Sequence, residues 1–416
     1  MADLKALKYT IESCNHCGQC KWLLPARMSG WDFASVCPIN AYFHFDAYSG
    51  QGMLNIAGEV MQSTISHSDD LAKMLQTCTA CGACDINCKN VRDMEVLDTI
   101  YELRRSSVEA GFLPESRRKT AENVQKEHNI YGLPHKDRFS FLPEDFEDDP
   151  DADTVLFAGC SVYRHPETLL AAIRILKAGG VKFRILREDE WCCGASMWRM
   201  GDYKAADALV RRNNELFASL GIKTVITACA ECFGAFLSGY PRFVQPEFKT
   251  LHITQVAAEL VKQGKLTFRE DGEPMIATYH DPCMLGRLSE EYVPWEGEIR
   301  SYGLHVPDKQ WRRGENGVYE QPRELLRAIP GVTIKEMPRS YEEAWCCGAN
   351  ASDVDPEFSA FTAEERRREA ASVGADTIVS CCPFCREALD ADDEYRLDYK
   401  DLTELIADRL SEEGQK

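Results

Sequence analysis

Residues 191–195 read Trp-Cys-Cys-Gly-Ala, and residues 345–349 repeat the same five amino acids. A second pair of segments keeps nearly the same spacing, because Thr224-Val-Ile-Thr-Ala-Cys-Ala-Glu-Cys232 returns as Thr377-Ile-Val-Ser-Cys-Cys-Pro-Phe-Cys385. The two offsets are 154 and 153 residues. A nearly constant offset between such rare residues indicates an internal repeat.

Each copy of the repeat alternates apolar strands with helical stretches. In the first copy we expect strands at 155–158, 181–186 and 224–227, and helices at 168–178 and 203–219. In the second copy we expect strands at 275–279, 332–336 and 377–380, and helices at 323–328 and 357–373. Such alternation predicts parallel sheets covered by helices, so the repeat predicts tandem α/β domains over residues 154–272 and 273–416.

Each repeat carries five cysteines, most of them at or near the ends of predicted strands. They are Cys160, Cys192, Cys193, Cys229 and Cys232 in the first, and Cys283, Cys346, Cys347, Cys382 and Cys385 in the second. Loops at the carboxyl ends of parallel strands converge, so each set is expected to meet. Five thiolates are too many for one tetrahedral zinc ion and more than a cubane cluster needs. Adjacent cysteines suit a wider cluster with bridging thiolates.

Residues 1–111 hold eight further cysteines and are predicted to form a helical, ferredoxin-like domain. Two runs with cysteine at every third position match two-cluster ferredoxins, in which the fourth ligand of each [4Fe–4S] cubane comes from the other run. This rule predicts one cluster on Cys14, Cys17, Cys20 and Cys88, and another on Cys78, Cys81, Cys84 and Cys37. Structural zinc is disfavoured, because zinc sites use separated Cys-x2-Cys knuckles. Residues 112–153 are expected to be a connector that ends in an acidic linker.

The composition excludes several classes of protein. The 416 residues include 67 acidic and 48 basic side chains, a formal charge of −19, so we expect no nucleic acid partner. The sequence lacks a secretory h-region and any apolar stretch of about 18 residues. We therefore expect a cytoplasmic protein with no membrane span of its own, peripheral at the inner face of the membrane at most through a partner. Nineteen clustered cysteines then indicate metal or redox chemistry instead of disulfides.

The two five-cysteine sets resemble the CCG domains of the heterodisulfide reductase family. With the ferredoxin-like front end, the whole chain is similar to the D-type subunit, which fuses the C and B subunits. The segment Tyr279-His-Asp-Pro-Cys-Met-Leu-Gly-Arg287 also resembles the second repeat of the family. The resemblance implies an α+β multidomain fold and two noncubane [4Fe–4S] clusters, one for each CCG domain, beside the two cubane clusters. It also implies that the disulfide of coenzyme M and coenzyme B is cleaved between the noncubane clusters.

Three residues near Cys283 are candidates for that chemistry. His280 and Asp281 could protonate a leaving thiolate, and Arg287 could bind an anionic substrate. The plainer interpretation is a turn-stabilising pair beside a ligand, with Arg287 as a surface residue. Cys381 is the nineteenth cysteine, and its counterpart in the first repeat is Ala228, so we expect a small buried residue and not a ligand.

Two functions fit these patterns. The first is an iron–sulfur oxidoreductase subunit of heterodisulfide reductase type, which relays electrons through two cubane clusters to two noncubane clusters and reduces a disulfide such as CoM-S-S-CoB. The alternative is a non-catalytic electron-transfer subunit, since the architecture also resembles donor modules of benzoyl-CoA reductase and iron–sulfur subunits of glycolate and glycerol-3-phosphate oxidases. No Gly-x-Gly-x-x-Gly motif is present, so electrons are expected to pass between this chain and a partner protein, either a flavoprotein or a membrane cytochrome b.

Overall fold

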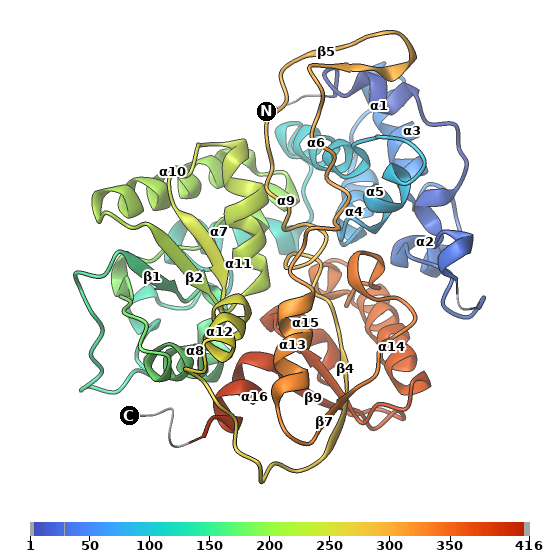
Figure 1. Ribbon diagram of the computed structural model, residues 1–416. Helices are drawn as coiled ribbons and strands as arrows, with labels where there is room; N and C mark the ends of the chain where they lie inside the picture. The colour runs from blue at the N-terminus through green and yellow to red at the C-terminus, as the bar shows by residue number, and fades with distance from the viewer. Residues whose placement is uncertain (1–3, 29, 412–416) are drawn as a thin grey trace.

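A computed structural model describes residues 4–28 and 30–411 of the chain (Figure 1). Its N-terminal part is a group of helices, and the two sequence repeats form two α/β units that lie below and beside it. The α+β multidomain fold predicted from the sequence is confirmed, as is the helical character of the N-terminal part.

The N-terminal part contains six helices in its described residues: α1 (Lys8–Glu12), α2 (Pro38–Phe43), α3 (Gly50–Met61), α4 (Asp69–Thr77), α5 (Ala83–Lys89) and α6 (Val96–Glu109). The side chains of Ser49 and Ser68 accept backbone N–H groups at the starts of α3 and α4, which satisfies donors that have no helical partner. Asp69 and Asp70 in the first turn of α4 also favour its positive N-terminal end. Helix α3 packs on α6, so buried apolar side chains link the two cysteine runs.

The first repeat is built on a parallel sheet of order β1-β2-β3. Its elements are β1 (Thr154–Phe157), α8 (Pro166–Ala178), α9 (Ala195–Met200), α10 (Tyr203–Ser219), β2 (Thr224–Thr227), α11 (Ala230–Gly234), β3 (Lys249–His252) and α12 (Ile253–Lys262). The strand predicted at 181–186 is wrong, because only Arg184 forms a bridge there, to Val155. Residues of the connector make the hydrogen bonds on either side of Arg184. The N–H of Asp149 donates to the Phe183 carbonyl, and the Asp148 carboxylate accepts the N–H of Ile185.

The second repeat has a parallel sheet of order β7-β4-β8-β9. Its elements are β4 (Met275–Tyr279), β5 (Glu298–Ile299), β6 (His305–Val306), α13 (Glu320–Ala328), β7 (Val332–Ile334), α14 (Pro356–Ser372), β8 (Thr377–Ser380), α15 (Pro383–Leu389), β9 (Asp398–Asp401) and α16 (Leu402–Arg409). The final strand and helix of each repeat, β3–α12 and β9–α16, were not predicted from the sequence.

Strand register places the two repeats in correspondence residue by residue. Leu156 of β1 pairs with Ile226 of β2, and Tyr279 of β4 pairs with Val379 of β8. Because Ile226 and Val379 are equivalent in the repeat, Leu156 is equivalent to Tyr279. One residue further on, Phe157 is equivalent to His280, and the same register makes Cys160 the counterpart of Cys283.

The two repeats share one core. Helix α8 of the first packs on α16 of the second, and α12 of the first packs on α13 of the second. Helix α8 is equivalent to α13, and α12 is equivalent to α16, so each contact joins the first of these helices in one repeat to the last in the other. This pattern is expected for two copies related by an approximate two-fold axis. Buried apolar residues from both repeats form one continuous cluster, so the relative placement of the cysteine loops is set by the common core.

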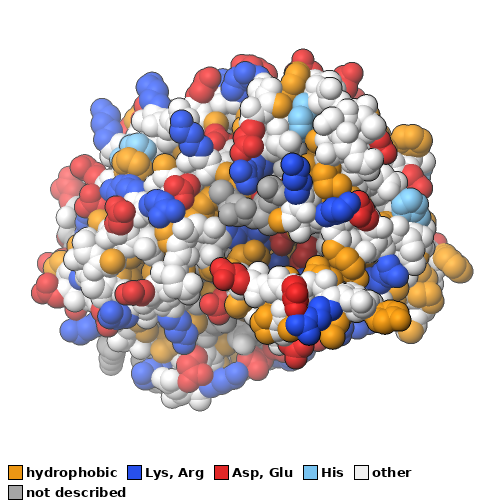
Figure 2. All heavy atoms as spheres, turned by 90° about the horizontal axis from the view of Figure 1, so that it is seen from above, with side chains coloured by type: hydrophobic (Ala, Val, Ile, Leu, Met, Phe, Trp, Pro, Cys, Tyr) orange, Lys and Arg blue, Asp and Glu red, His pale blue; other side chains and the backbone are white. Residues whose placement is uncertain are grey.

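Two segments, the connector and an insertion in the second repeat, hold the three parts of the chain together. The connector contains α7 (Glu115–Glu127), and its fully buried Arg138 donates to the Glu190 carboxylate of the first repeat at 2.7 Å. The insertion, residues 291–318, carries the antiparallel β5–β6 pair and reaches over the N-terminal helices (Figure 1). Its Lys309 pairs with Glu95 next to α6. Seen from above, acidic and basic side chains are interspersed around a hollow near the middle of this face (Figure 2).

Candidate metal centres

All nineteen cysteines are free thiols in the structure, and all but Cys381 belong to the four groups described below. Most are buried, and Cys17 is the one exposed member among the described residues. Isolated thiols gain little from meeting in buried groups of four or five, whereas thiolates that share iron need such groups. An all-cysteine donor set with no disulfide therefore fits iron–sulfur clusters.

The first group brings cysteines of the two N-terminal runs together. Cys14, Cys17 and Cys20 line one cavity of about 20 Å³ together with Cys88, which comes from α5. Burial raises the pKa of the Cys88 thiol, and the neighbouring Asp85 and the three other thiols raise it further. Three thiols from one loop thus meet a fourth that lies 68 residues beyond Cys20 in sequence.

The second group contains Cys37, Cys78, Cys81 and Cys84. Cys37 stands just before α2, and its thiol lies within electrostatic range of the Cys78 and Cys81 thiols. Burial raises its pKa well above the usual value, and these neighbours add to the effect. The buried Arg104 holds the loop in place, because its guanidinium donates to the carbonyls of Leu75 and Cys78.

In the first repeat, Cys193 lies at the centre of the five thiols. It is hydrogen-bonded to Cys192 on one side and to Cys232 on the other, and these bonds lower its pKa to about 6. Cys160 bonds to Cys192, and Cys229 bonds to Cys232, so the set forms one continuous chain of sulfurs.

The second repeat reproduces this arrangement around Cys347. Hydrogen bonds to Cys346 and Cys385 lower the pKa of Cys347 well below its usual value. Cys385 bonds in turn to Cys382. Cys346 differs from its counterpart Cys192, because it bonds to Cys81 of the N-terminal domain where Cys192 bonds to Cys160 of its own repeat. The second repeat therefore lies directly against the second N-terminal group.

A glycine follows each Cys-Cys pair because the backbone turns there through a left-handed conformation. Gly194 has φ of 87° and Gly348 has φ of 89°, values that side chains disfavour. Each glycine starts a short helix directly after the thiol pair, α9 after Gly194 and the helical turn Ala349–Ala351 after Gly348. The turn thus brings backbone close to the sulfurs.

Buried carboxylates hold the cysteine loops in each repeat. Glu190 precedes Trp191 and accepts the N–H groups of Ala158 and Gly159 at 2.8 and 2.9 Å, while Arg138 neutralises it. Burial raises the pKa of Glu190, and these three partners oppose that effect. In the second repeat, Asp281 accepts the N–H of Tyr341 at 2.9 Å. Both acids thus join the loop of the first cysteine to the loop of the Cys-Cys pair.

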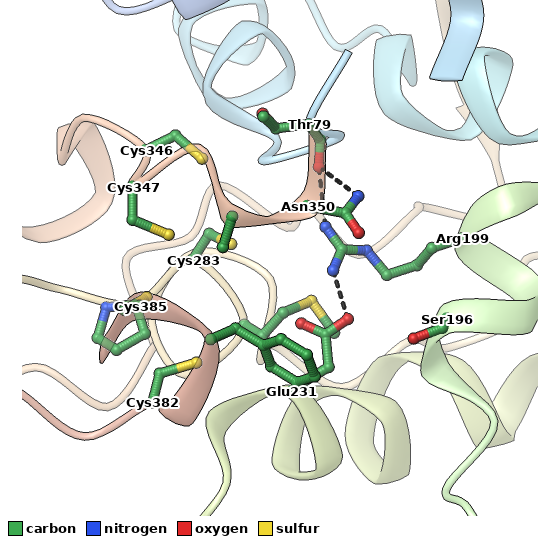
Figure 3. A pocket seen from close by; sticks show the side chains of 14 residues that line it. Thr79, Ser196, Arg199, Glu231, Cys283, Cys346, Cys347, Asn350, Cys382 and Cys385 are labelled. Atoms are coloured by element: carbon green, nitrogen blue, oxygen red, sulfur yellow. Dashed lines mark hydrogen bonds and ion pairs between the residues drawn. The ribbon is translucent and has the colours of Figure 1, made fainter. Parts of the chain in front are cut away.

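A cavity of about 40 Å³ lies where the two repeats meet the N-terminal domain (Figure 3). Cys283, Cys346, Cys347, Cys382 and Cys385 of the second repeat line one side. Arg199 and Glu231 of the first repeat form a buried ion pair on the other side. Arg199 also donates to the Thr79 carbonyl at 3.0 Å, and Asn350 donates to the same oxygen at 3.1 Å. The cavity is thus walled by all three parts of the chain.

The three predicted catalytic residues lie behind the cysteine loops and do not line this cavity. The Asp281 carboxylate is bound by both terminal nitrogens of Arg323, at 2.7 and 2.9 Å. Arg287 is 4 % exposed, and it donates to the carbonyls of Glu342 and Ala344 just before Trp345. The imidazole Nδ1 of His280 accepts a hydrogen bond from Arg366 at 3.0 Å.

The sequence reasoning missed the charged residues that do line the cavity. Arg199 lies six positions after Cys193, and Glu231 lies between Cys229 and Cys232. The available signal for these two residues was a charged side chain inside a Cys-x2-Cys loop or on the short helix after Cys-Cys-Gly. It was weak, because only the tertiary fold shows that both side chains are buried and paired.

Comparison with known families matches each part of this architecture. Residues 10–91 match the 4Fe-4S dicluster domain, and residues 154–236 and 303–390 match the cysteine-rich CCG domain. The second CCG match begins after Cys283, which the strand register nonetheless makes the counterpart of Cys160. Fold and sites together define an iron–sulfur protein that joins a dicluster domain to two cysteine-rich domains.

Known relatives identify the family. The D-type heterodisulfide reductase subunit of Methanosarcina mazei is 31% identical over 417 residues, covering 96% of this chain and 94% of the relative. The D-type subunit of Methanosarcina barkeri is also 31% identical, with the same coverage. The EtfAB:quinone oxidoreductase of Syntrophomonas wolfei is 27% identical over 90% of this chain and 54% of its own length. The chain belongs to the family of D-type heterodisulfide reductase subunits, which are iron–sulfur oxidoreductases.

Proposed function

We propose that this chain is the iron–sulfur subunit of a heterodisulfide reductase-type complex. Two cubane clusters would be held by the N-terminal thiols and two noncubane clusters by the repeats, and the subunit would reduce a disulfide such as CoM-S-S-CoB. The observation that carries the proposal is the cavity at which five thiols of the second repeat face the Arg199–Glu231 pair of the first.

The order of the thiol groups supports a path for electrons. The first N-terminal group includes the exposed Cys17 and is suited to exchange with a partner protein. The second group contacts the second repeat through Cys81 and Cys346. When bound, iron–sulfur clusters at these groups supply one-electron carriers. Reduction of one disulfide to two thiols takes two electrons and two protons.

The residues around the cavity suit an anionic substrate. Arg199 keeps its charge, because Glu231 and the neighbouring Tyr101 and Cys283 raise its pKa despite the cost of burial. Its guanidinium is fixed by the ion pair and by the Thr79 carbonyl, and its Nε–H has no hydrogen-bond acceptor among the described residues, which leaves this donor for a carboxylate, sulfonate or phosphate. Asp281 and Arg287 are proposed to position the cysteine loops, since their polar groups are already bound to protein.

The partner is proposed to be a flavoprotein or a membrane cytochrome b that exchanges electrons with the first N-terminal group. No described helix has both the length and the apolar character needed to cross a bilayer. Any association with a membrane is proposed to use the partner. The named relatives, a heterodisulfide reductase subunit and a quinone oxidoreductase, support a place in such a complex.

One observation favours the alternative of a non-catalytic relay. The cavity of about 40 Å³ is far smaller than the roughly 300–1,000 Å³ typical of ligand pockets. A disulfide would then enter only if Phe384, Met284 or other lining side chains move aside. Without such movement, the chain would pass electrons to another subunit in which the substrate reacts.

Rapid mixing of the anaerobically reduced protein with CoM-S-S-CoB separates the two functions. Release of free thiols with a new paramagnetic signal from the second-repeat site is the result expected for a reductase. The variant Arg199→Lys should weaken this response, whereas Ser196→Ala, which alters a neutral side chain of the same cavity, should not. Cluster oxidation and reduction without thiol release in the unaltered protein would leave the relay function.

A further inference from the structure

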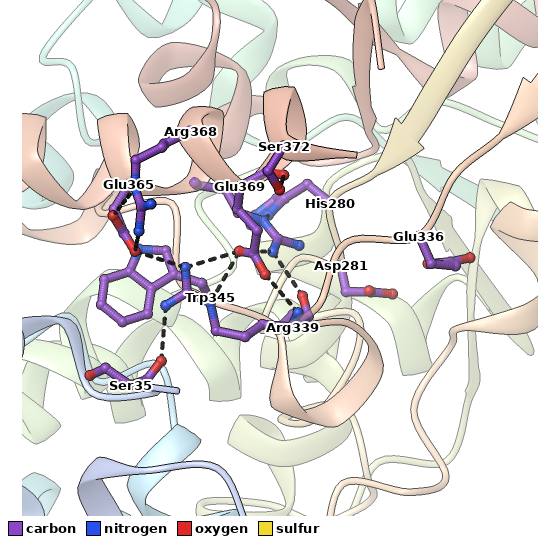
Figure 4. Close-up of polar contacts among 12 residues, drawn as sticks. Ser35, His280, Asp281, Glu336, Arg339, Trp345, Glu365, Arg368, Glu369 and Ser372 are labelled. Carbon is purple, nitrogen blue, oxygen red and sulfur yellow. Dashed lines mark hydrogen bonds and ion pairs between the residues drawn. The ribbon is translucent and has the colours of Figure 1, made fainter. Parts of the chain in front are cut away.

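A buried polar network in the second repeat joins His280, Arg339 and Glu369 (Figure 4). Arg366 donates from Nε to His280 Nδ1 at 3.0 Å and from Nη1 to Glu369 at 2.7 Å. Arg339 also binds Glu369, at 3.0 Å, and donates to the carbonyl of Ser35 at 2.9 Å. All four charged or imidazole side chains are at most 1 % exposed. The network therefore runs from the loop before Cys37 to the imidazole of His280.

The hydrogen bond from Arg366 fixes the state of the imidazole. A guanidinium only donates, so Nδ1 of His280 must accept with its lone pair. A neutral imidazole then carries its hydrogen on Nε2. A second proton would place a cation against Arg366 in a buried site, which disfavours the doubly protonated ring.

The other side of the ring faces the sulfurs. A ring nitrogen of His280 and the Sγ atoms of Cys347 and Cys385 all lie within 4.8 Å of one another. Because Arg366 occupies Nδ1, Nε2 is the nitrogen left for these sulfurs. Since Nε2 bears the hydrogen, it is able to donate to a thiolate but has no lone pair with which to bind iron.

The first repeat has no such donor. Its equivalent residue is Phe157, which is fully buried among the rings of Phe217 and Phe236. The thiol pattern is the same in both repeats, and Cys193 is the counterpart of Cys347. The two sites thus differ in the ring beside the central thiols, an imidazole in the second repeat and a phenyl group in the first.

We infer that His280 donates its Nε2–H to the thiolate of Cys347 or Cys385 and thereby raises the reduction potential of the second-repeat cluster relative to that of the first. Arg366 and Glu369 position the ring for this role. A hydrogen bond to sulfur stabilises the additional negative charge of the reduced cluster. The inference rests on the proposed function only in that the second-repeat thiols hold an iron–sulfur cluster.

The consequence is a difference in potential between two sites with identical ligand sets. Electrons that arrive through the Cys81–Cys346 contact would be held preferentially at the second repeat, on the side of the cavity where its five thiols lie. His280 therefore acts through the ligands and does not need to contact substrate, which agrees with its position outside the cavity lining.

An anaerobic redox titration followed by EPR tests the inference, with the second-repeat signal assigned by its loss in Cys347→Ala. His280→Phe installs the first-repeat residue and should make reduction of this cluster about tenfold less favourable, which corresponds to about 59 mV for one electron. The other signals and the iron content should stay unchanged. His280→Gln retains an N–H donor and should recover most of the shift. His67→Gln, which alters a part-buried histidine bonded to Ser106 of α6, should have no effect.

A second measurement does not depend on the folding of any variant. Pulsed EPR of the unaltered protein with ¹⁵N-labelled histidine should show a weak coupling from one nitrogen, as expected for a hydrogen bond to sulfur. Three results would overturn this inference but not the proposed function. They are the strong coupling of a directly bound nitrogen, the absence of any nitrogen coupling, and an unchanged reduction potential in His280→Phe with its cluster intact. Absence of a second-repeat cluster in the unaltered protein would overturn the proposed function as well.

Discussion

The two repeats place their five thiols alike but support them with different side chains. In the first repeat the carboxylate belongs to Glu190, just before Trp191, and it accepts backbone N–H groups near Cys160. In the second repeat the carboxylate belongs to Asp281, near Cys283, and it accepts a backbone N–H before Trp345. The acid thus lies in the loop of the Cys-Cys pair in the first repeat, and in the loop of the first cysteine in the second repeat.

Strand register shows that the two acids occupy different positions of the repeat, and that each has an alanine as its equivalent in the other copy. Asp281 is equivalent to Ala158, and Glu190 is equivalent to Ala344. Each acid has its own arginine, Arg138 from the connector in one case and Arg323 from α13 in the other. The comparison teaches that the thiol positions are constrained closely, whereas the loops need only some buried acceptor for their N–H groups.

A second difference concerns the neighbours of each repeat. Cys346 bonds to Cys81, and the insertion of the second repeat contacts the N-terminal helices. In the first repeat the equivalent thiol, Cys192, bonds instead to Cys160 of its own repeat. Equal thiol sets thus stand in unequal surroundings, and the predictions below test which of these differences matter.

The largest effect is expected from removing the central thiol of either repeat. Cys193→Ala and Cys347→Ala should each lose the cluster of their own repeat, about four iron atoms per chain, because the central sulfur links its neighbours on both sides. Iron and sulfide analysis with EPR of anaerobic protein measures the loss. Loss of both repeat clusters in one variant would contradict independent sites, and loss of neither would contradict the ligand assignment.

Replacing the buried acid of either repeat by alanine should have the next largest effect. Glu190→Ala leaves the buried Arg138 without its carboxylate and should lower the free energy of unfolding by about 3–5 kcal/mol. Asp281→Ala should cost less, because Arg323 keeps its ion pair with Glu336. Anaerobic denaturant unfolding measures the change. The control is Glu298→Ala, which breaks an exposed ion pair with Arg300 and should change stability by less than about 1 kcal/mol. An equal loss for the two variants would show that Glu336 does not compensate Arg323 for the loss of Asp281.

The sequence led to a specific prediction for the thiol groups because iron–sulfur chemistry constrains cysteine spacing. The pairing of Cys88 with the first run followed from a rule of ligand exchange, and the structure places those four thiols around one cavity. Helices such as α10 were predicted from periodicity to the residue. Supporting residues such as Glu190 and Arg199 were missed, because a buried charge and an exposed charge look alike in a sequence. The false strand at 181–186 has a similar cause, since Asp148 and Asp149 of the connector compete for its hydrogen bonds.

A smaller effect is expected where the insertion fastens the second repeat to the N-terminal domain. Lys309→Met should lower the free energy of unfolding by about 1 kcal/mol, because it removes a partly buried pair with Glu95 but keeps the apolar stem. Denaturant unfolding measures this change. Lys335→Met, at an exposed lysine of the second repeat, is the matched control and should be neutral. An equal loss in both variants would show that charge alone, and not the fastening contact, is responsible.

The smallest effect is expected at Cys381, where the second repeat carries a thiol and the first carries Ala228. The side chain is fully buried, and its Sγ lies 2.9 Å from the hydroxyl of Tyr279. Cys381→Ala installs the first-repeat residue, so it should leave the iron content unchanged and cost about 1 kcal/mol for the lost hydrogen bond. Tyr279→Phe removes the same bond from the other side, and the double variant should cost little more than either single one. Loss of iron in Cys381→Ala would instead make this residue a sixth thiol of the second site, and the equality of the two ligand sets would no longer hold.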